Sequence, residues 1–136
     1  MAQVRHVVLV GHCGADCWAL RAAVEEALPG MAVESASVTA QLEPFVNSQS
    51  LLLINRILDG DLGTVRGLEL IGKLAERPDP PVMILVSDYA DAQEAAEAAG
   101  ARPGFGKGEL GGQRAAQRLR HAAGLPDAQC PTSPPP

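Results

Sequence analysis

Four polar side chains stand at the ends of short apolar runs, where they could act together. His12 follows HVVLV after one glycine, Asn55 ends SLLLIN, Ser87 follows VMILV, and Lys107 follows ARPGFG. The asparagine amide can donate and accept hydrogen bonds, but it is a far poorer nucleophile than a carboxylate. Ser87 has no evident histidine partner for nucleophilic catalysis. The set therefore predicts a polar binding site, and we expect a protein that is not an enzyme.

A metal or nucleotide site is the alternative interpretation of the segment GHCGADC. His12, Cys13 and Cys17 are soft-metal ligand types, but three side chains make an incomplete tetrahedral set and the chain has no CxxC pair. The cysteines are better interpreted as small buried apolar residues. The glycines resemble a phosphate-binding turn, yet the segment matches neither GxGxxG nor a Walker A loop. We therefore expect no metal and no cofactor.

The elements that must position these side chains are short strands and amphipathic helices. Continuous apolar runs predict strands buried on both faces, and a more alternating run predicts an edge strand: 6–10, 51–54 and 82–86, then 31–38, with a fifth strand near 102–106. Apolar residues at helical spacing predict helices between them, over 20–28, 68–74, 92–99 and 110–122, with a short one near 41–47. The order is β-α repeated five times, which predicts a doubly wound α/β fold of three layers. In such a fold, ligands bind at the carboxyl ends of the strands.

Composition and charge narrow the classes of function. The 136 residues suit one domain, which we place at 1–124, followed by a Pro-rich disordered tail at 125–136. A net charge of −5 argues against nucleic-acid binding. The basic group near the end of the chain is interpreted as the solvated face of a helix rather than a phosphate-binding patch: Arg114, Arg118, Arg120 and His121. No apolar run approaches the roughly 20 residues that cross a bilayer, and no signal peptide is evident, so we expect a cytoplasmic protein without membrane contact.

Three segments together resemble the receiver domain of bacterial two-component response regulators. They are GLELIGKL after the third strand, VSDYADAQEAAEAAGA, and GFGKGEL. The resemblance spans about residues 5–124. It implies a flavodoxin-like, receiver-like sheet with strand order 2-1-3-4-5.

The resemblance also implies which residues would form a phosphorylation site, and two parts of that site depart from the family pattern. Ser87 and Lys107 match the residues that bind phosphoryl oxygens in the family. Asn55 stands at the position of the phosphorylated Asp, while Gly11 and His12 stand at the acidic pair that holds Mg²⁺. An amide lacks the nucleophilic carboxylate, and Mg²⁺ favours carboxylate ligands. The expected site is degenerate, with no metal.

Three details of this site stay open in the sequence. Asp59 and Asp61 lie in a loop longer than the family's usual one, and they form either a solvated turn or a substitute acceptor. We expect Asn55 and Lys107 to share a hydrogen bond. Because Gly104 occupies the place where the family often has its switch aromatic, we interpret Phe105 as a core residue.

Two classes of function follow. The first is an atypical receiver, or pseudo-receiver, which acts in signal transduction as a phosphorylation-independent protein-interaction module. Its partners would be signalling proteins bound through residues 89–124, or a second copy of the chain. The alternative is a small-molecule or nucleotide-binding protein that uses the crevice at the strand ends. A weaker alternative is a single-domain regulator phosphorylated on a loop aspartate.

Overall fold

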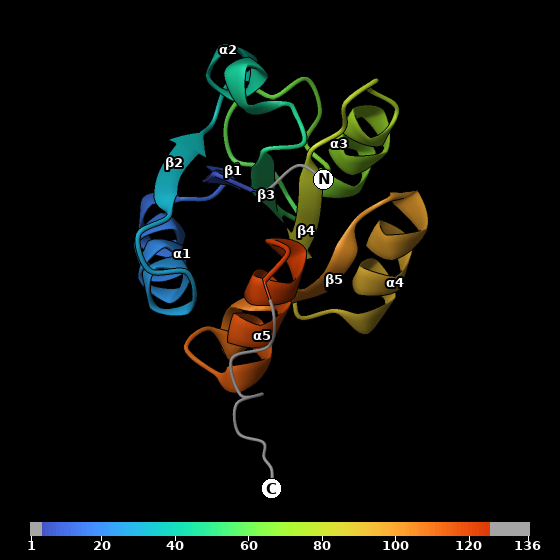
Figure 1. Cartoon of the computed structure of the whole chain (residues 1–136). Coiled ribbons are helices and arrows are strands. Elements are labelled where there is room, and N and C mark those ends of the chain that lie inside the picture. The colour runs from blue at the N-terminus through green and yellow to red at the C-terminus, as the bar shows by residue number, and fades with distance from the viewer. Residues whose placement is uncertain (1–3, 126–136) are drawn as a thin grey trace, which may run out of the picture.

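Five parallel strands form the centre of the structure, a computed structural model that describes residues 4–125 (Figure 1). The strands lie in the order β2-β1-β3-β4-β5. Their bounds are β1 (His6–Val10), β2 (Ala32–Ala36), β3 (Ser50–Asn55), β4 (Val82–Val86) and β5 (Arg102–Phe105). The predicted doubly wound α/β fold and its strand order 2-1-3-4-5 are confirmed. The predicted tail at 125–136 lies outside the described residues, apart from Leu125.

Helices cover both faces of the sheet, which gives the three predicted layers (Figure 1). The cores show that α1 and α5 cover one face, and that α2, α3 and α4 cover the other. The helices are α1 (Gly14–Ala27), α2 (Thr39–Leu42), α3 (Gly67–Ala75), α4 (Ala90–Ala99) and α5 (Gln113–Ala122), with 3-10 turns at Glu43–Phe45 and Lys107–Glu109.

The strands are apolar throughout because each central strand supplies both cores. In β3, Leu51 and Leu53 pack toward α1 and α5, while Leu52 and Ile54 pack toward α3 and α4. All four are fully buried. Since successive side chains of a strand point to opposite faces, a strand between two helical layers needs apolar residues at every position. Asn55 is the last residue of β3, and it is the first residue of the strand that is only partly buried.

The long loop between β3 and α3 is held down by two leucines. Leu58 and Leu62 are each 5% exposed, and they join the core beneath α3 and α4. The loop also bonds to the end of β2, because the amide of Asp61 donates to the carbonyl of Ser37 at 2.7 Å. The acidic side chains of the loop are exposed, as the turn interpretation expected, but their backbone is tied to the sheet.

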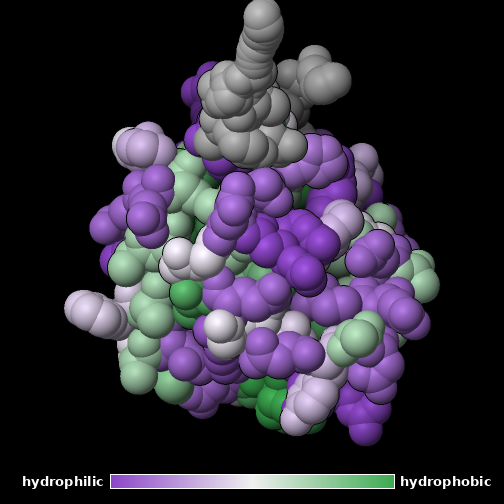
Figure 2. Space-filling model, turned by 90° about the horizontal axis from the view of Figure 1, so that it is seen from below, coloured by the Kyte–Doolittle hydropathy of each residue, from purple (hydrophilic) through white to green (hydrophobic). Residues whose placement is uncertain are grey.

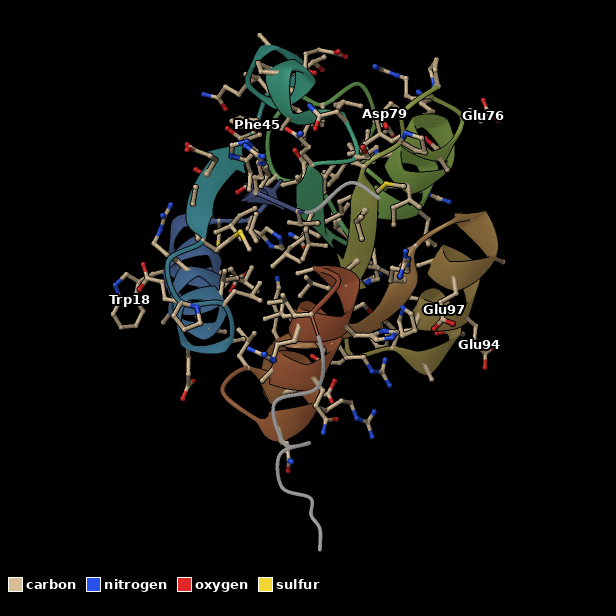
Figure 3. All side chains as sticks on the ribbon, viewed as in Figure 1. Trp18, Phe45, Glu76, Asp79, Glu94 and Glu97 are labelled. Atoms are coloured by element: carbon tan, nitrogen blue, oxygen red, sulfur yellow. The ribbon has the colours of Figure 1, made fainter. Side chains whose placement is uncertain are left out.

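The outer surface is mostly polar. Figure 2 views the molecule from below Figure 1, and hydrophilic residues predominate there, with hydrophobic residues in small separate areas. Trp18 points away from α1 and is 77% exposed (Figure 3). Within residues 4–125, no helix combines the length and the apolar character that crossing a membrane requires.

Candidate functional site

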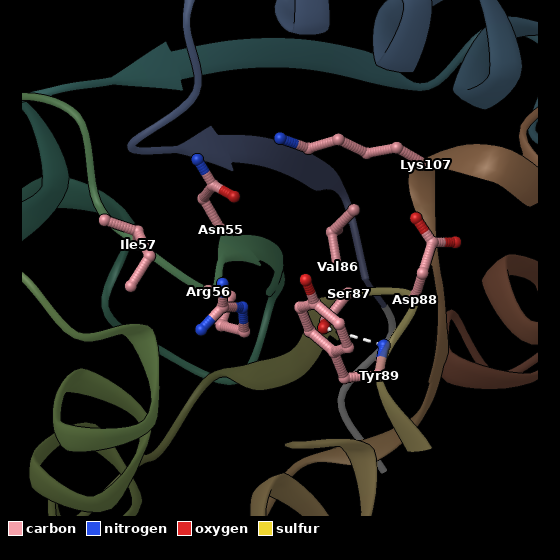
Figure 4. A pocket seen from close by; sticks show the side chains of 8 residues that line it. All are labelled: Asn55, Arg56, Ile57, Val86, Ser87, Asp88, Tyr89 and Lys107. Carbon is pink, nitrogen blue, oxygen red and sulfur yellow. Dashed lines mark hydrogen bonds between the residues drawn. The ribbon is translucent and has the colours of Figure 1, made fainter. Parts of the chain in front are cut away.

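A pocket of about 340 Å³ opens at the carboxyl ends of β3 and β4, beside the segment that follows β5 (Figure 4). It brings together three side chains singled out in the sequence, Asn55, Ser87 and Lys107. The other lining residues are Arg56, Ile57, Val86, Asp88 and Tyr89. The topology explains the convergence, since parallel strands end at one edge of the sheet. Gly11 and His12 do not line this pocket.

The expected hydrogen bond between Asn55 and Lys107 was wrong. Asn55 Nδ2 donates to the carbonyl oxygen of Gly11 at 2.9 Å, so the amide links β3 to the end of β1. Lys107 Nζ instead donates to Asp16 Oδ2 at 2.6 Å. Asp16 belongs to the first turn of α1, and its importance was not visible in the sequence because 91 residues separate it from Lys107.

Lys107 and Asp16 form an ion pair at this end of the sheet. The Lys107 ammonium holds the pKa of the Asp16 carboxyl below its usual value, mainly through the hydrogen bond. The two side chains are 36% and 32% exposed, so water still screens the pair. A lysine that would face a phosphoryl group in a receiver site is therefore already paired within the protein.

Gly11 occupies the first position of the expected acidic pair, and a side chain there would have to displace Leu58. Its φ is +73°, a left-handed conformation that side chains other than glycine rarely adopt. A Cβ at this position would lie 2.7 Å from Leu58 Cδ2. The amide of Asp59 also donates to the Gly11 carbonyl at 2.9 Å. The long loop thus places an aliphatic side chain against the position that the resemblance assigns to a metal-binding carboxylate.

His12 occupies the second position, and its imidazole turns into the protein. Nε2 lies 2.8 Å from the carbonyl oxygen of Leu53, and because a carbonyl only accepts, Nε2 carries the proton. Nδ1 is buried with no hydrogen-bond partner in residues 4–125. Burial lowers the pKa of His12 to about 4, although the bond to Leu53 opposes this and the charge of Lys107 adds to it. His12 is therefore neutral near pH 7.

The expected degenerate site does not fit Mg²⁺. Gly11 has no side chain, His12 presents its only accepting nitrogen to the interior, and Asn55 directs its NH₂ group to a carbonyl. Mg²⁺ needs oxygen ligands in octahedral geometry, usually with carboxylates among them. Asp16 is bonded to Lys107, and no set of three or more His, Cys, Asp or Glu side chains in the described chain could hold a metal.

The cysteines near His12 have different environments. Cys13 is exposed, so its interpretation as a buried apolar residue was wrong. Cys17 is partly buried beside the core, and burial raises the pKa of its thiol. Cys17 Sγ donates a weak hydrogen bond to the His12 carbonyl at 3.7 Å. Cys130 lies outside the described residues.

The wall formed by β4 and β5 explains why the switch aromatic is missing. Ile84 pairs with Arg102 and Val86 pairs with Phe105, so β5 carries one extra residue, a bulge. The bulge directs Phe105 into the core, where it is 1% exposed, as expected. At Gly104 a Cβ would lie 2.5 Å from the Leu85 carbonyl oxygen. An aromatic side chain has no room at that position.

Ser87 and Gln93 complete this wall. Ser87 is 7% exposed, and its Oγ accepts a hydrogen bond from the amide of Tyr89 at 3.1 Å (Figure 4). Gln93 Nε2 donates to the carbonyls of Leu85 and Ser87, at 2.8 and 3.0 Å. These hydrogen bonds hold the end of β4 in place.

Two pocket residues, Arg56 and Tyr89, were given no role at this site in the sequence. The Arg56 guanidinium carbon lies 4.8 Å from the centre of the Tyr89 ring, a cation–π contact that spans the pocket mouth. Tyr89 is 58% exposed. Arg56 directly follows Asn55, and Tyr89 lies two residues after Ser87, so the available signal was closeness to the strand ends.

The remaining charged candidates lie elsewhere. Asp59 and Asp61 do not line the pocket, and the backbone of Asp61 bonds to the end of β2, across the sheet from β5. In the basic group of α5, Arg118 donates to the Gly104 carbonyl at 2.8 Å and Arg120 to the Ala27 carbonyl at 3.0 Å. These two arginines therefore fasten α5 to its neighbours, which corrects the interpretation of the group as only solvated.

Comparison with solved structures shows that the chain has the receiver fold. A response regulator from Colwellia psychrerythraea is 22% identical, with a TM-score of 0.61 over 89% of this chain and 98% of that one. The beryllofluoride-activated NtrC4 receiver domain dimer is 19% identical, with a TM-score of 0.66 over 89% and 98%. A response regulator receiver domain from Rhodospirillum rubrum is 13% identical, with a TM-score of 0.59 over 87% and 90%. No protein-family model and no curated protein matches the sequence.

Proposed function

We propose that this chain is a pseudo-receiver, a module of signal transduction that binds protein partners without being phosphorylated and without catalysing a reaction. The observation that carries the proposal is the position of Leu58, whose Cδ2 would lie 2.7 Å from a Cβ at position 11. The loop after β3 covers the position where a receiver would hold a metal-binding carboxylate, so the departure is built into the packing and is more than one changed residue.

The environment of Asn55 supports the same proposal. Its NH₂ group donates a hydrogen bond to the Gly11 carbonyl at 2.9 Å. A carboxylate at this position would face that carbonyl with no proton to share, so two acceptors would repel each other, although the Gly11 carbonyl would keep its bond from the Asp59 amide. The site therefore favours the uncharged amide and disfavours the nucleophile that aspartyl phosphorylation requires.

A pseudo-receiver needs another source of switching. A partner changes the conformation of a protein only if it binds one state more tightly than another. We place the partner surface on residues 89–124, with signalling proteins or a second copy of the chain as partners and the cytoplasm as the location. α4 supports contact there because small exposed alanines such as Ala95 and Ala98 let another chain approach closely.

A second candidate is favoured by the pocket itself. Arg56, Lys107 and Ser87 present two cations and a hydroxyl around about 340 Å³, which would suit a small anionic molecule or a nucleotide. The pairing of Lys107 with Asp16 weakens this candidate, because binding would compete with that ion pair. Phosphorylation on Asp59 or Asp61 has less support, since neither side chain lines the pocket.

The test is to add Mg²⁺ with acetyl phosphate or with beryllofluoride and to record intact mass and amide NMR spectra. The pseudo-receiver predicts no mass adduct and no specific shifts at Ser87 and Lys107. Saturable shifts there, or a phosphoryl adduct on any aspartate, would overturn it. A thermal-shift screen against nucleotides tests the second candidate, which a saturable rise in melting temperature would favour.

The variant Asn55→Asp is the matched control for this experiment. It restores the acceptor carboxylate but leaves Gly11 and Leu58 in place. We expect it to stay unphosphorylated, because the metal-binding carboxylates are still missing. Recovery of phosphorylation by this single change would show that Gly11 and His12 do not block the site.

A further inference from the structure

A second groove lies beside the pocket, between the amino-terminal ends of α3 and α4. Its volume is about 670 Å³, and it shares Arg56, Ile57 and Tyr89 with the pocket. The remaining lining residues are Arg66, Leu68, Asp91, Ala92 and Ala95. The groove is continuous with the strand-end site, but α3 and the loop before it lie outside the segment 89–124 that we proposed as the partner surface.

The groove exposes apolar side chains that the fold itself does not need. Ile57 is 52% exposed and Tyr89 is 58% exposed, although most other large apolar side chains of residues 4–125 are buried. Val65 is 63% exposed and precedes Arg66 directly. Exposed apolar side chains gathered at one place, rather than scattered singly, mark a surface that binds something.

The charge at the groove is unusual for this protein. The chain has a net charge of −5, yet two arginines, Arg56 and Arg66, line the groove. Neither forms an ion pair with a carboxylate of residues 4–125; Arg56 contacts the Tyr89 ring instead. Asp91 is the one acidic residue in the lining. The groove thus combines apolar contact area with unpaired guanidinium groups.

The wall that carries both arginines is held in place by backbone bonds. Ile57 and Arg66 form an antiparallel bridge. The amide of Leu58 donates to the Val65 carbonyl at 2.8 Å, and the amide of Gly67 donates to the Arg56 carbonyl at 2.8 Å. A prearranged wall loses less conformational entropy on binding, so it suits recognition.

We propose that this groove binds an acidic peptide segment of a protein partner that carries one or two aliphatic or aromatic side chains. These apolar side chains would pack against Ile57, Tyr89 and Ala95. Flanking carboxylates would bond to Arg56 and Arg66, whose planar guanidinium groups suit bidentate contact with carboxylates. This proposal rests on the proposed function of the chain as a protein-interaction module, and it names the chemistry of the partner and a contact surface.

The test is an amide NMR titration with three blocked nine-residue peptides. EDELFEDEE carries the proposed chemistry, KRKLFKRKK reverses its charge, and EDEGGEDEE removes its apolar side chains. We expect saturable shifts at Ile57, Arg66 and Ala95 with the first peptide, and at least tenfold weaker binding of the other two. No saturable shift at these residues with the first peptide up to about 5 mM, a very weak affinity, would overturn the proposal.

Variants of the groove sharpen the test. The double variant Arg56→Glu with Arg66→Glu should weaken binding of EDELFEDEE at least tenfold, while Arg102→Glu, which reverses an exposed arginine outside the groove, should leave it unchanged. Asp91→Asn removes the repelling carboxylate and should strengthen binding a few fold. Equal binding by the double variant and the unchanged chain would overturn the proposal.

The same samples separate this proposal from the proposed function. Titration with Mg²⁺ and beryllofluoride reports on Ser87 and Lys107, and the peptides report on the groove. If neither ligand shifts its residues, the groove proposal fails and the pseudo-receiver stands. If beryllofluoride alone causes shifts, both fail.

Discussion

Lys107 forms an ion pair with Asp16, with 2.6 Å between Nζ and Oδ2, across 91 residues of sequence. The pair ties the segment after β5 to the first turn of α1. The resemblance assigns this lysine to phosphoryl oxygens, whereas its anionic partner in the structure is the Asp16 carboxylate. The Asp16 carboxylate therefore compensates the charge of Lys107 within the protein.

The first prediction tests this ion pair with Asp16→Asn. The two side chains are about one third exposed, so we expect a loss in the free energy of unfolding of about 0.2–1 kcal/mol at pH 7, smaller at high salt. The folded pKa of Asp16 lies below its unfolded value of 3.8. Its contribution is therefore complete above pH 3.8 and disappears as the pH falls through the folded pKa.

Urea unfolding at two salt concentrations measures the difference in the free energy of unfolding between Asp16→Asn and the unchanged chain. Circular dichroism is the suitable signal, because Trp18 is 77% exposed and its emission changes little on unfolding. Glu43→Gln is the matched control, since it breaks the 2.8 Å pair with Arg77 on the surface away from the site. A loss above about 2 kcal/mol for Asp16→Asn would contradict a screened pair.

The second prediction concerns the covered position at Gly11. Gly11→Ala places a Cβ in a left-handed backbone and against Leu58. The backbone alone costs about 1–2 kcal/mol, and overpacking adds about 1–3 kcal/mol. Gly30→Ala is the control, because Gly30 has a φ of +83° but a Cβ added there would have nothing within 4 Å. Thermal unfolding should therefore show a larger loss for Gly11→Ala than for Gly30→Ala.

A double-mutant cycle isolates the contact between Gly11 and Leu58. Leu58→Ala removes the Cδ2 atom that a Cβ at position 11 would meet at 2.7 Å, while Cα and Cβ, each 3.2 Å from that Cβ, remain. The cost of Gly11→Ala should be smaller in the Leu58→Ala background, by about 0.5–3 kcal/mol of coupling. Additive losses would mean that Leu58 Cδ2 does not block the position.

The sheet and the strand ends could be predicted from the sequence because burial on both faces leaves a strong pattern. The apolar runs at β1, β3 and β4 were placed within one residue of their observed ends. Ser87, Asn55 and Lys107 then converge because parallel strands end together. These are properties of local sequence and of topology, and neither depends on which side chains touch.

The partners of those side chains could not be predicted in the same way. The Lys107–Asp16 and Asn55–Gly11 contacts join residues 91 and 44 positions apart, so no local pattern reports them. The packing of Leu58 over Gly11 depends on the path of a long loop. The sequence indicated the departure from the receiver pattern at Gly11, but the steric reason for it needed the structure.

The third prediction tests the bulge in β5. Gly104→Ala places a Cβ 2.5 Å from the Leu85 carbonyl oxygen and 2.8 Å from Gln93 Oε1, so the strand or Gln93 must move. We expect a loss of about 2 kcal/mol or more in the free energy of unfolding. Gly72→Ala is the opposite control, because nothing lies within 4 Å of that position inside α3. It should stabilise the protein by about 0.5–1 kcal/mol.

The fourth prediction is an acid-sensitive stability caused by His12. Burial lowers its pKa from 6.5 to about 4, so below pH 6.5 the unfolded chain binds a proton that the folded chain refuses. Stability should then fall from pH 6.5 to pH 4 by up to about 3 kcal/mol, at 1.36 kcal/mol per pH unit, and change little further from this residue below pH 4.

Removal of the titrating ring in His12→Gln should flatten that part of the profile, measured by urea unfolding at each pH. His121→Gln is the control, because that side chain is exposed and its removal should leave the slope in place. The charges near His12 are Lys107 and Asp16, so repeating the measurement in Asp16→Asn checks whether the ion pair contributes. An unchanged slope in His12→Gln would assign the acid sensitivity to other groups and contradict a neutral, buried imidazole at the second position of the site.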